Sequence, residues 1–344
     1  MKTLSALHAF LRLRLAWLEQ LLIAAGFTAL LAQLVNARPV YPLHWDTVLL
    51  AGVFVLLLLR PTIGYFAIMA VALYPLGDIS IYLAVLALAV ALLGQRWFIP
   101  NLGLVLLVIS APFLNGAYLA WLVPVLGGLW WGPRAGLLAG LFAALASKIL
   151  FGLLGLSPDW LALSGLYPDL TPALLRFHLL SSWQTLKLLA TPFLTDTTTT
   201  LYHFLQISIW AFAGWLIGRL SLEDRIQYHR PRSTLALIIA NTFVLGILQF
   251  LLLMWIGTTD PAQALLDNLL PNALLTLLVA SLAESIVFFL EYPWRVPAAD
   301  YTPAPPQRRE ERMAPPPALE PESGQPTNNK PKQADESFIL IELD

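Results

Sequence analysis

The sequence contains no cysteine, which excludes disulfides, thiolate metal sites and cysteine nucleophiles. Charged residues are also scarce, at 12% of the chain, whereas a soluble globular protein carries about a quarter. Glycine-rich phosphate loops, nucleophile elbows and zinc-protease motifs are missing, and the five histidines show no metal-ligand spacing. The basic residues form no single patch for nucleic acid. The sequence therefore predicts no catalytic residue, no metal, no cofactor and no nucleic acid partner, and an enzyme is not the first expectation.

Long apolar runs are the dominant feature of the sequence. The chain is 58% hydrophobic, with a mean hydropathy of +0.70. Runs long enough to cross a lipid bilayer recur between residues 15 and 292. The sequence therefore predicts an all-α, polytopic membrane protein, a helical bundle in the cell (plasma) membrane.

We expect about ten transmembrane helices. Several of those between residues 48 and 131 are shorter than the roughly 20 residues that a crossing needs, so they are half-helices or parts of longer tilted helices. The apolar run at residues 16–35 resembles a signal peptide, but it is too long and lacks a clear cleavage site. We therefore expect it to be an uncleaved first helix. The predicted spans are 16–35, 48–59, 62–76, 79–94, 101–114, 117–131, 135–156, 198–219, 233–256 and 269–292.

The distribution of charge favours an even number of crossings with both termini in the cytoplasm, because basic residues prefer the cytoplasmic side. Ten crossings place only Arg38, Arg176 and Lys187 outside among the basic residues between Lys2 and Arg295. The aspartates that they also place outside are Asp46, Asp78, Asp159, Asp169, Asp196, Asp260 and Asp267. The basic residues then inside are Lys2, Arg12, Arg14, Arg60, Arg96, Arg134, Arg219, Arg225, Arg230, Arg232 and Arg295.

Three regions follow from these spans. Residues 1–96 form N-terminal helices, and residues 97–295 form a six-helix bundle with an external segment at 157–197. Leucines at helical spacing over 172–190 predict an amphipathic helix on the outer surface, which either covers an outward cavity or seals the bundle rim. Residues 296–344 are proline-rich and predict a disordered cytoplasmic tail, whose apolar end at 337–344 either docks a cytoplasmic partner or has none.

Polar side chains inside the predicted spans are the candidate ligand-binding residues. Each residue of a helix rises 1.5 Å, so the position of a residue relative to the helix ends gives its depth in the membrane. Counted in this way, the polar residues lie at two depths, an outer layer and an inner layer. The outer layer lines a pocket open to the exterior, or the whole set serves as hydrogen bonds between helices. An ion pair between Lys148 and Glu284 would bridge roughly 10 Å between the layers. The outer layer holds Lys148, Gln206 and Gln249, and the inner layer holds Asn241 and Glu284.

Two ladders of small residues repeat every four positions over residues 132–144, at the start of the seventh span. Each ladder lies on one helix face and lets a neighbouring backbone approach closely. That neighbour is another helix of the bundle or a separate membrane subunit. Trp130, Trp131 and Arg134 before them are typical of a cytoplasmic membrane interface. The ladders are Gly132, Gly136, Gly140 and Ala144, and Ala135, Ala139 and Ala143.

The stretches GGLWWGPRAGLLAG and WAFAGWLIGRL within residues 101–292 resemble the substrate-binding S components of energy-coupling-factor vitamin transporters. This resemblance implies a bacterial six-helix bundle that binds a small molecule and docks a transmembrane coupling subunit. The chain departs from that pattern, because its alanine ladder lies on the third helix of the bundle and four helices precede it. Rod-shape-determining proteins and bacterial sensory membrane domains share the glycine pattern.

We therefore expect first a small-molecule binding or transport component that docks a membrane partner. The alternative is a membrane scaffold or sensory protein that recruits a cytoplasmic partner through residues 337–344. An envelope glycan enzyme comes third, because the segment RPTIGYFAIMAVALYPLGD is similar to the start of O-antigen-ligase-like polymerases. Its candidate residues would be Arg176 and His178.

Overall fold

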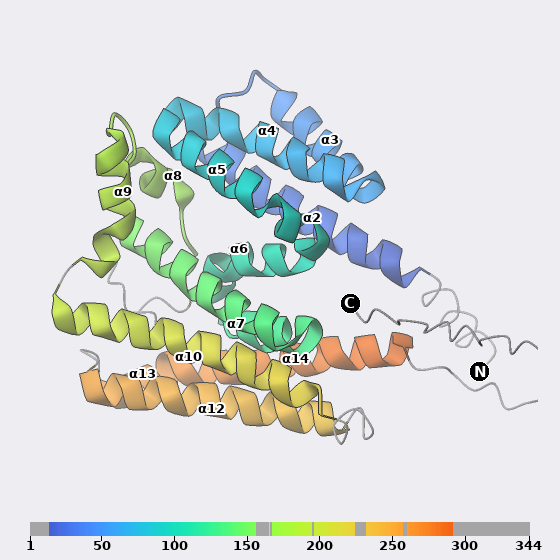
Figure 1. Cartoon of the computed structure of the whole chain (residues 1–344), viewed down its shortest axis with the longest axis vertical. Coiled ribbons are helices and arrows are strands. Elements are labelled where there is room, and N and C mark those ends of the chain that lie inside the picture. The colour runs from blue at the N-terminus through green and yellow to red at the C-terminus, as the bar shows by residue number, and fades with distance from the viewer. Residues whose placement is uncertain are drawn as a thin grey trace, which may run out of the picture. The chain divides into compact units, whose positions relative to one another are not determined.

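The computed structural model describes residues 14–155, 165, 167–194, 196–223, 232–256 and 260–291 (Figure 1). All regular secondary structure in these ranges is helical. Seven of the helices are long and apolar enough to cross a membrane, and α3 is a shorter apolar helix. The protein is therefore an all-α, multi-pass membrane protein. The count of ten crossings stays a prediction, and the tail at 296–344, with its end at 337–344, lies outside the described residues.

The first four described helices share one apolar core. They are α2 (Leu15–Ala37), α3 (Trp45–Leu59), α4 (Pro61–Ile79) and α5 (Ile81–Phe98). Single residues, Arg60 and Ser80, separate α3 from α4 and α4 from α5. Proline at the first position of α4 suits a helix start, because its ring fixes φ and that position needs no N–H donor. The core contains Ala24, Phe27, Leu31, Val35, Val53, Leu57, Tyr65, Val71, Ala91 and Leu102.

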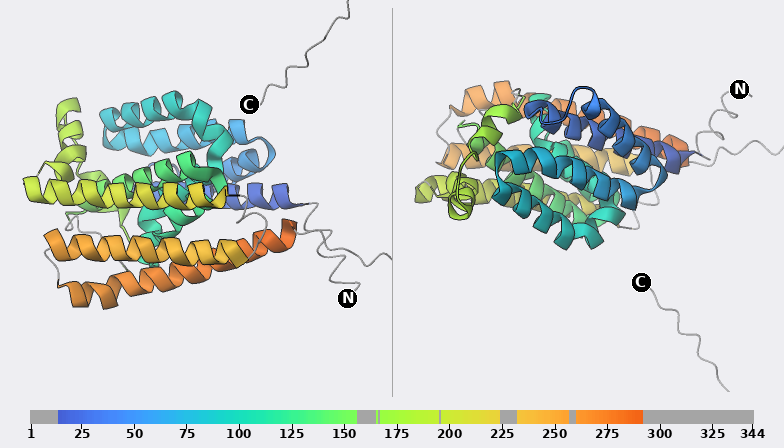
Figure 2. Two further views of the ribbon diagram at one scale, coloured as in Figure 1. Left: turned by 60° about the horizontal axis from the view of Figure 1, so that its bottom comes forward. Right: turned by 90° about the horizontal axis from the view of Figure 1, so that it is seen from above.

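The remaining long helices form a second group. After the turn η1 (Ile99–Asn101) come α6 (Leu102–Gly116), α7 (Leu122–Leu153), α10 (Thr197–Ser221) and α12 (Arg232–Ile256). The last helix runs through α13 (Pro261–Ala264), the π-helical turn η4 (Leu265–Leu269) and α14 (Leu270–Glu291). Helix α7 contacts α6 and α10, and α12 contacts α10 and α14 (Figure 2).

Helix α7 is broken at Gly132, which has φ 83° and ψ −176°. Only glycine adopts this conformation without strain, because it has no Cβ. A Cβ placed on Gly127 would lie 2.8 Å from the Cβ of Ala139, whereas twelve residues of straight helix span about 18 Å. Residues 133–153 therefore fold back against residues 122–131. The first part covers only about half of a bilayer's hydrocarbon thickness.

The small-residue ladders of α7 pack inside the chain. A Cβ on Gly136 would overlap the carbonyl oxygen of Gly214, and a Cβ on Gly140 would overlap that of Trp210, both in α10. Ala139, Ala143 and Ala144 are fully buried in the same core, and Ala135 packs against it. Gly136 and Gly140 therefore pack against α10, and Ala139 packs against Gly127 in the first part of α7, which corresponds to internal helix packing.

The external segment differs from the single helix expected over 172–190. It contains α8 (Leu170–Leu175) and α9 (Ser182–Ala190), followed by the 3₁₀ turn η3 (Thr191–Phe193). Ser181 and Gln184 form a reciprocal capping box that starts α9 anew, and Leu179 before it has φ 61°. The cap satisfies backbone N–H groups that would otherwise lack partners, so it competes with continuation of the preceding helix.

We predict that Gly140→Ala destabilises the protein by about 1–3 kcal/mol, because the added methyl group meets the backbone of α10. The matched control is Gly52→Ala in α3, where a Cβ would meet nothing within 4 Å. That control should gain up to about 1 kcal/mol from helix propensity. Thermal unfolding of both variants in detergent checks this, and equal stabilities would contradict the packing described here.

Candidate functional site

A cluster of buried polar side chains lies where α7, α10 and α12 meet. The glycine contacts of Gly136 and Gly140 hold α7 against α10, and two turns beyond Gly140 the side chain of Lys148 reaches α10. Lys148 is 1% exposed, Gln206 in α10 is 0% exposed and Gln249 in α12 is 2% exposed. Three of the five residues that the sequence proposed for ligand binding are therefore together.

Lys148 is held by two side chains of α10. Its Nζ lies 2.8 Å from Nδ1 of His203, and it also donates a hydrogen bond to Oε1 of Gln206. The same ammonium lies 5.8 Å from the centre of the Tyr202 ring, within the range of a cation–π contact. Lys148 is five residues from the end of α7, which is about 7.5 Å along the helix.

The amide of Gln206 extends the hydrogen bonds to a third helix. Its Nε2 donates to the hydroxyl of Tyr202 at 3.0 Å and approaches Oε1 of Gln249 at 3.5 Å. We call Lys148, Tyr202, His203, Gln206 and Gln249 the Lys148 cluster. It joins α7, α10 and α12 through polar contacts inside an otherwise apolar core.

The other two proposed residues lie elsewhere. Asn241 is buried in α12 eight residues before Gln249, which is about 12 Å along the helix. Glu284 in α14 accepts a hydrogen bond from Nε1 of Trp130 at 3.2 Å. Glu284 thus bonds Trp130 while Lys148 bonds side chains of α10, and Asn241 is separated from Gln249 along α12. The ion pair between Lys148 and Glu284 stays a prediction.

Sequence reasoning missed Tyr202, His203 and the role of Trp130. Tyr202 and His203 lie four and three positions before Gln206, so all three share one face of α10. That spacing was a usable signal for the cluster. Trp130, which we expected to face the membrane interface, instead bonds Glu284, and no sequence spacing links residues 130 and 284.

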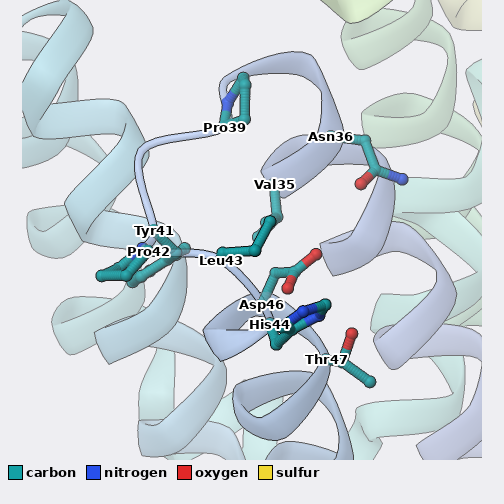
Figure 3. Close-up of a pocket in the computed structure, with 9 residues that line it drawn as sticks. All are labelled: Val35, Asn36, Pro39, Tyr41, Pro42, Leu43, His44, Asp46 and Thr47. Atoms are coloured by element: carbon teal, nitrogen blue, oxygen red, sulfur yellow. The ribbon is translucent and has the colours of Figure 1, made fainter.

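A surface pocket of about 230 Å³ opens where α2 ends and α3 begins (Figure 3). The loop around it is held by Arg38 Nε, which donates to Asp78 at 2.7 Å, and by the Tyr41 hydroxyl, which donates to the Val71 carbonyl at 2.7 Å. The pocket shares no residue with the Lys148 cluster. Its lining is Val35, Asn36, Pro39, Tyr41, Pro42, Leu43, His44, Asp46 and Thr47.

The described ranges contain no group of three or more His, Asp or Glu side chains able to hold a metal ion. Arg176 and His178, the candidates for a glycan enzyme, are both exposed in the turn between α8 and α9. The geometry and the apolar helices thus define a multi-pass membrane protein that buries the Lys148 cluster among its described helices. In comparisons with known proteins, no protein family, curated protein or solved structure matches the chain.

We predict that Gln206→Leu destabilises the protein by roughly 1–3 kcal/mol, because it removes the acceptor of Lys148 and the donor to Tyr202 while both stay buried. Gln33→Leu makes the same substitution at an exposed position of α2 and should shift stability by less than about 0.5 kcal/mol. Thermal midpoints in detergent measure the difference. A Gln206→Leu protein as stable as the Gln33→Leu control would contradict the network.

Asp196 begins α10, where its carboxylate accepts hydrogen bonds from the backbone N–H groups of Thr198 and Thr199 at 3.1 Å each. Hydrogen bonds from the Thr199 hydroxyl and backbone hold the pKa of Asp196 below its ordinary value. A carboxyl group whose pKa is depressed by folding stabilises the fold above its unfolded pKa, near about 3.9. That stabilisation is lost as the pH falls through the folded pKa.

We predict that Asp196→Asn weakens the dependence of the unfolding midpoint on pH below about pH 5. Glu19→Gln neutralises an exposed carboxyl group in α2 and is the matched control. Midpoints recorded from pH 6 to pH 3 would test this. An unchanged pH profile for Asp196→Asn would show that the cap does not depend on the carboxylate charge.

Proposed function

We propose that this membrane protein binds a small polar molecule at the Lys148 cluster and takes part in its transport across the membrane. The observation that carries the proposal is the buried Lys148 ammonium between His203 and Gln206. An ionisable group at such a position in a membrane helix is costly to bury and faces the bundle interior, where it marks substrate or ion pathways.

A purely structural role, in which polar side chains hold helices together by hydrogen bonds, explains only some residues of the Lys148 cluster. A contact such as that of Gln206 with Gln249 fits the role of a bond between helices, which is worth under about 1 kcal/mol. A lysine gains little there, because an apolar side chain of similar length would fill the space without burying a charge. The presence of Lys148 and His203 in contact therefore favours a role in binding.

The position of the cluster also favours access from one end of the bundle. Lys148 lies near the end of α7, and His203 lies six residues after the start of α10. The chain between these helix ends includes α8, α9 and η3, and the Phe193 ring of η3 stands edge-on to His203 at 6.1 Å. The charge distribution of the sequence favours an outer position for this end.

Docking of a membrane subunit belongs to the same proposal, but the glycine ladder of α7 does not supply the surface. Gly136 and Gly140 are covered by α10. A partner would therefore use an exposed apolar face, such as that of α12, where Phe243 and Met254 are 70% and 61% exposed. Lipid covers such a face equally well.

The proposal is tested by purifying the protein in mild detergent and identifying small molecules in the extract by mass spectrometry. Lys148→Met should retain at least tenfold less of the bound molecule than the wild type, since losing one charge-assisted hydrogen bond costs about 1.4 kcal/mol or more. Lys187→Met alters an exposed lysine of α9 and serves as the control. Equal retention by both variants and the wild type would rule out the Lys148 cluster as the binding site.

A further inference from the structure

The hydrogen bonds of the Lys148 cluster determine which atoms donate and which accept. Nζ of Lys148 lies within bonding distance of Oε1 of Gln206 and Nδ1 of His203. A carbonyl oxygen only accepts, and an ammonium group carries three donors and no acceptor. Lys148 therefore donates to both atoms. Because Nδ1 of His203 accepts, the neutral imidazole carries its hydrogen on Nε2.

The amides follow the same logic. Oε1 of Gln206 faces Lys148, so its Nε2 is the atom that donates to Tyr202 and to Oε1 of Gln249. Oε1 of Gln249 therefore accepts from Gln206, and Nε2 of Gln249 is the atom of this amide that faces away from Gln206. Each orientation in the chain of hydrogen bonds is fixed by the donor character of Lys148.

Two donors of the Lys148 cluster have no acceptor among the described residues. Nε2 of His203 and Nε2 of Gln249 are both inaccessible and have no hydrogen-bond partner within the described residues. Both side chains are at most 2% exposed. A buried N–H group without an acceptor is unfavourable, and it is more so inside a membrane, where water does not replace the missing partner.

We propose that the Lys148 cluster recognises a carboxylate group of its ligand. A carboxylate carries two acceptor oxygens, one for Nε2 of His203 and one for Nε2 of Gln249, and no donor. Its negative charge is attracted by the Lys148 ammonium, and charge-assisted hydrogen bonds are stronger than neutral ones. A cationic ligand would meet donors and a like charge. The inference rests on the function proposed above and adds the chemical class of the ligand.

The cluster is closed in this structure, so a ligand reaches it through the end of the bundle. Phe193 is the aromatic side chain next to His203 on that side, and its backbone carbonyl accepts a hydrogen bond from the Thr200 hydroxyl at 3.0 Å. This hydrogen bond joins η3 to the first turn of α10, and the Phe193 ring also contacts the rings of His203 and Phe204 in α10.

The test uses acetate as the probe, with acetamide and methylammonium as neutral and cationic counterparts of similar size. Thermal unfolding in detergent at pH 7 is recorded at increasing concentrations of each. A ligand that binds only the folded state raises the midpoint by an amount that grows with the logarithm of its concentration once this exceeds the Kd. We expect acetate to raise the midpoint of the wild type, and acetamide and methylammonium to leave it unchanged.

Gln249→Glu is the decisive variant, because it replaces the amide donor by an acceptor and adds a negative charge beside Lys148. Gln263→Glu makes the same charge change at an exposed position of α13. Acetate should stabilise Gln263→Glu like the wild type and should leave Gln249→Glu unchanged. An equal response in the two variants, an equal response to acetamide, or no response to acetate in the wild type would each overturn the proposal.

A second measurement does not depend on any ligand. Nitrogen-15 NMR of histidine-labelled protein distinguishes the two imidazole tautomers, and His203→Gln identifies the signals of His203 among the five histidines. We expect a hydrogen on Nε2 and none on Nδ1, with the Nε2 signal shifting when acetate is added. A hydrogen on Nδ1 would overturn the donor assignment and the proposal with it.

Failure of this inference differs from failure of the proposed function. A neutral or cationic molecule that co-purifies and is lost in Lys148→Met would leave the binding function standing and exclude the carboxylate. A molecule retained equally by Lys148→Met and Lys187→Met would contradict both the proposed binding function and the carboxylate inference. A carboxylic acid retained by the wild type and lost in Lys148→Met supports both.

Discussion

The backbones of α7 and α10 meet at glycines, and the rest of the second helical group is arranged around that contact. Gly136 faces Gly214, and Gly140 faces the backbone of Trp210. In a membrane, apolar burial drives helices together only weakly, because lipid is as apolar as a leucine side chain. Close packing of small residues therefore supplies much of the association. It also sets the rotation of α7, which turns Lys148 toward α10 rather than toward lipid.

This rotation explains how a lysine is accommodated in an apolar bundle. Its ammonium needs several acceptors, and α10 provides two of them three positions apart, at His203 and Gln206. Gln249 in α12 then engages the amide of Gln206. If α7 and α10 were further apart, the lysine would reach toward the helix end and the polar side chains of α10 would lose their partner. The small residues and the polar cluster are therefore parts of one arrangement.

Much of this organisation could be predicted from the sequence, because a helix converts position into depth and face. The apolar runs predict a helical membrane protein, and the four-residue spacing of the small residues predicts a close-packed helix face. The distance from the helix ends predicts that Lys148, Gln206 and Gln249 lie at the same depth. Neither the partner of the ladder nor the contact of Trp130 with Glu284 could be predicted, because depth carries no information on how helices rotate. Ser181 and Gln184 show the opposite case, because their spacing in the sequence fits a capping box, whereas the leucine spacing over 172–190 predicts one continuous helix.

Gly132 connects the two polar centres of the bundle. Residues 122–131 carry Trp130, which donates to Glu284 in α14, and residues 133–153 carry Lys148, which donates to α10. The backbone between them turns at one residue whose positive φ only glycine adopts easily. Trp130 and Lys148 lie on opposite sides of this turn, so the angle between the two halves of α7 determines where the two side chains stand relative to each other. The fold thus gives one residue control over the relative position of the buried cluster and the Trp130–Glu284 pair.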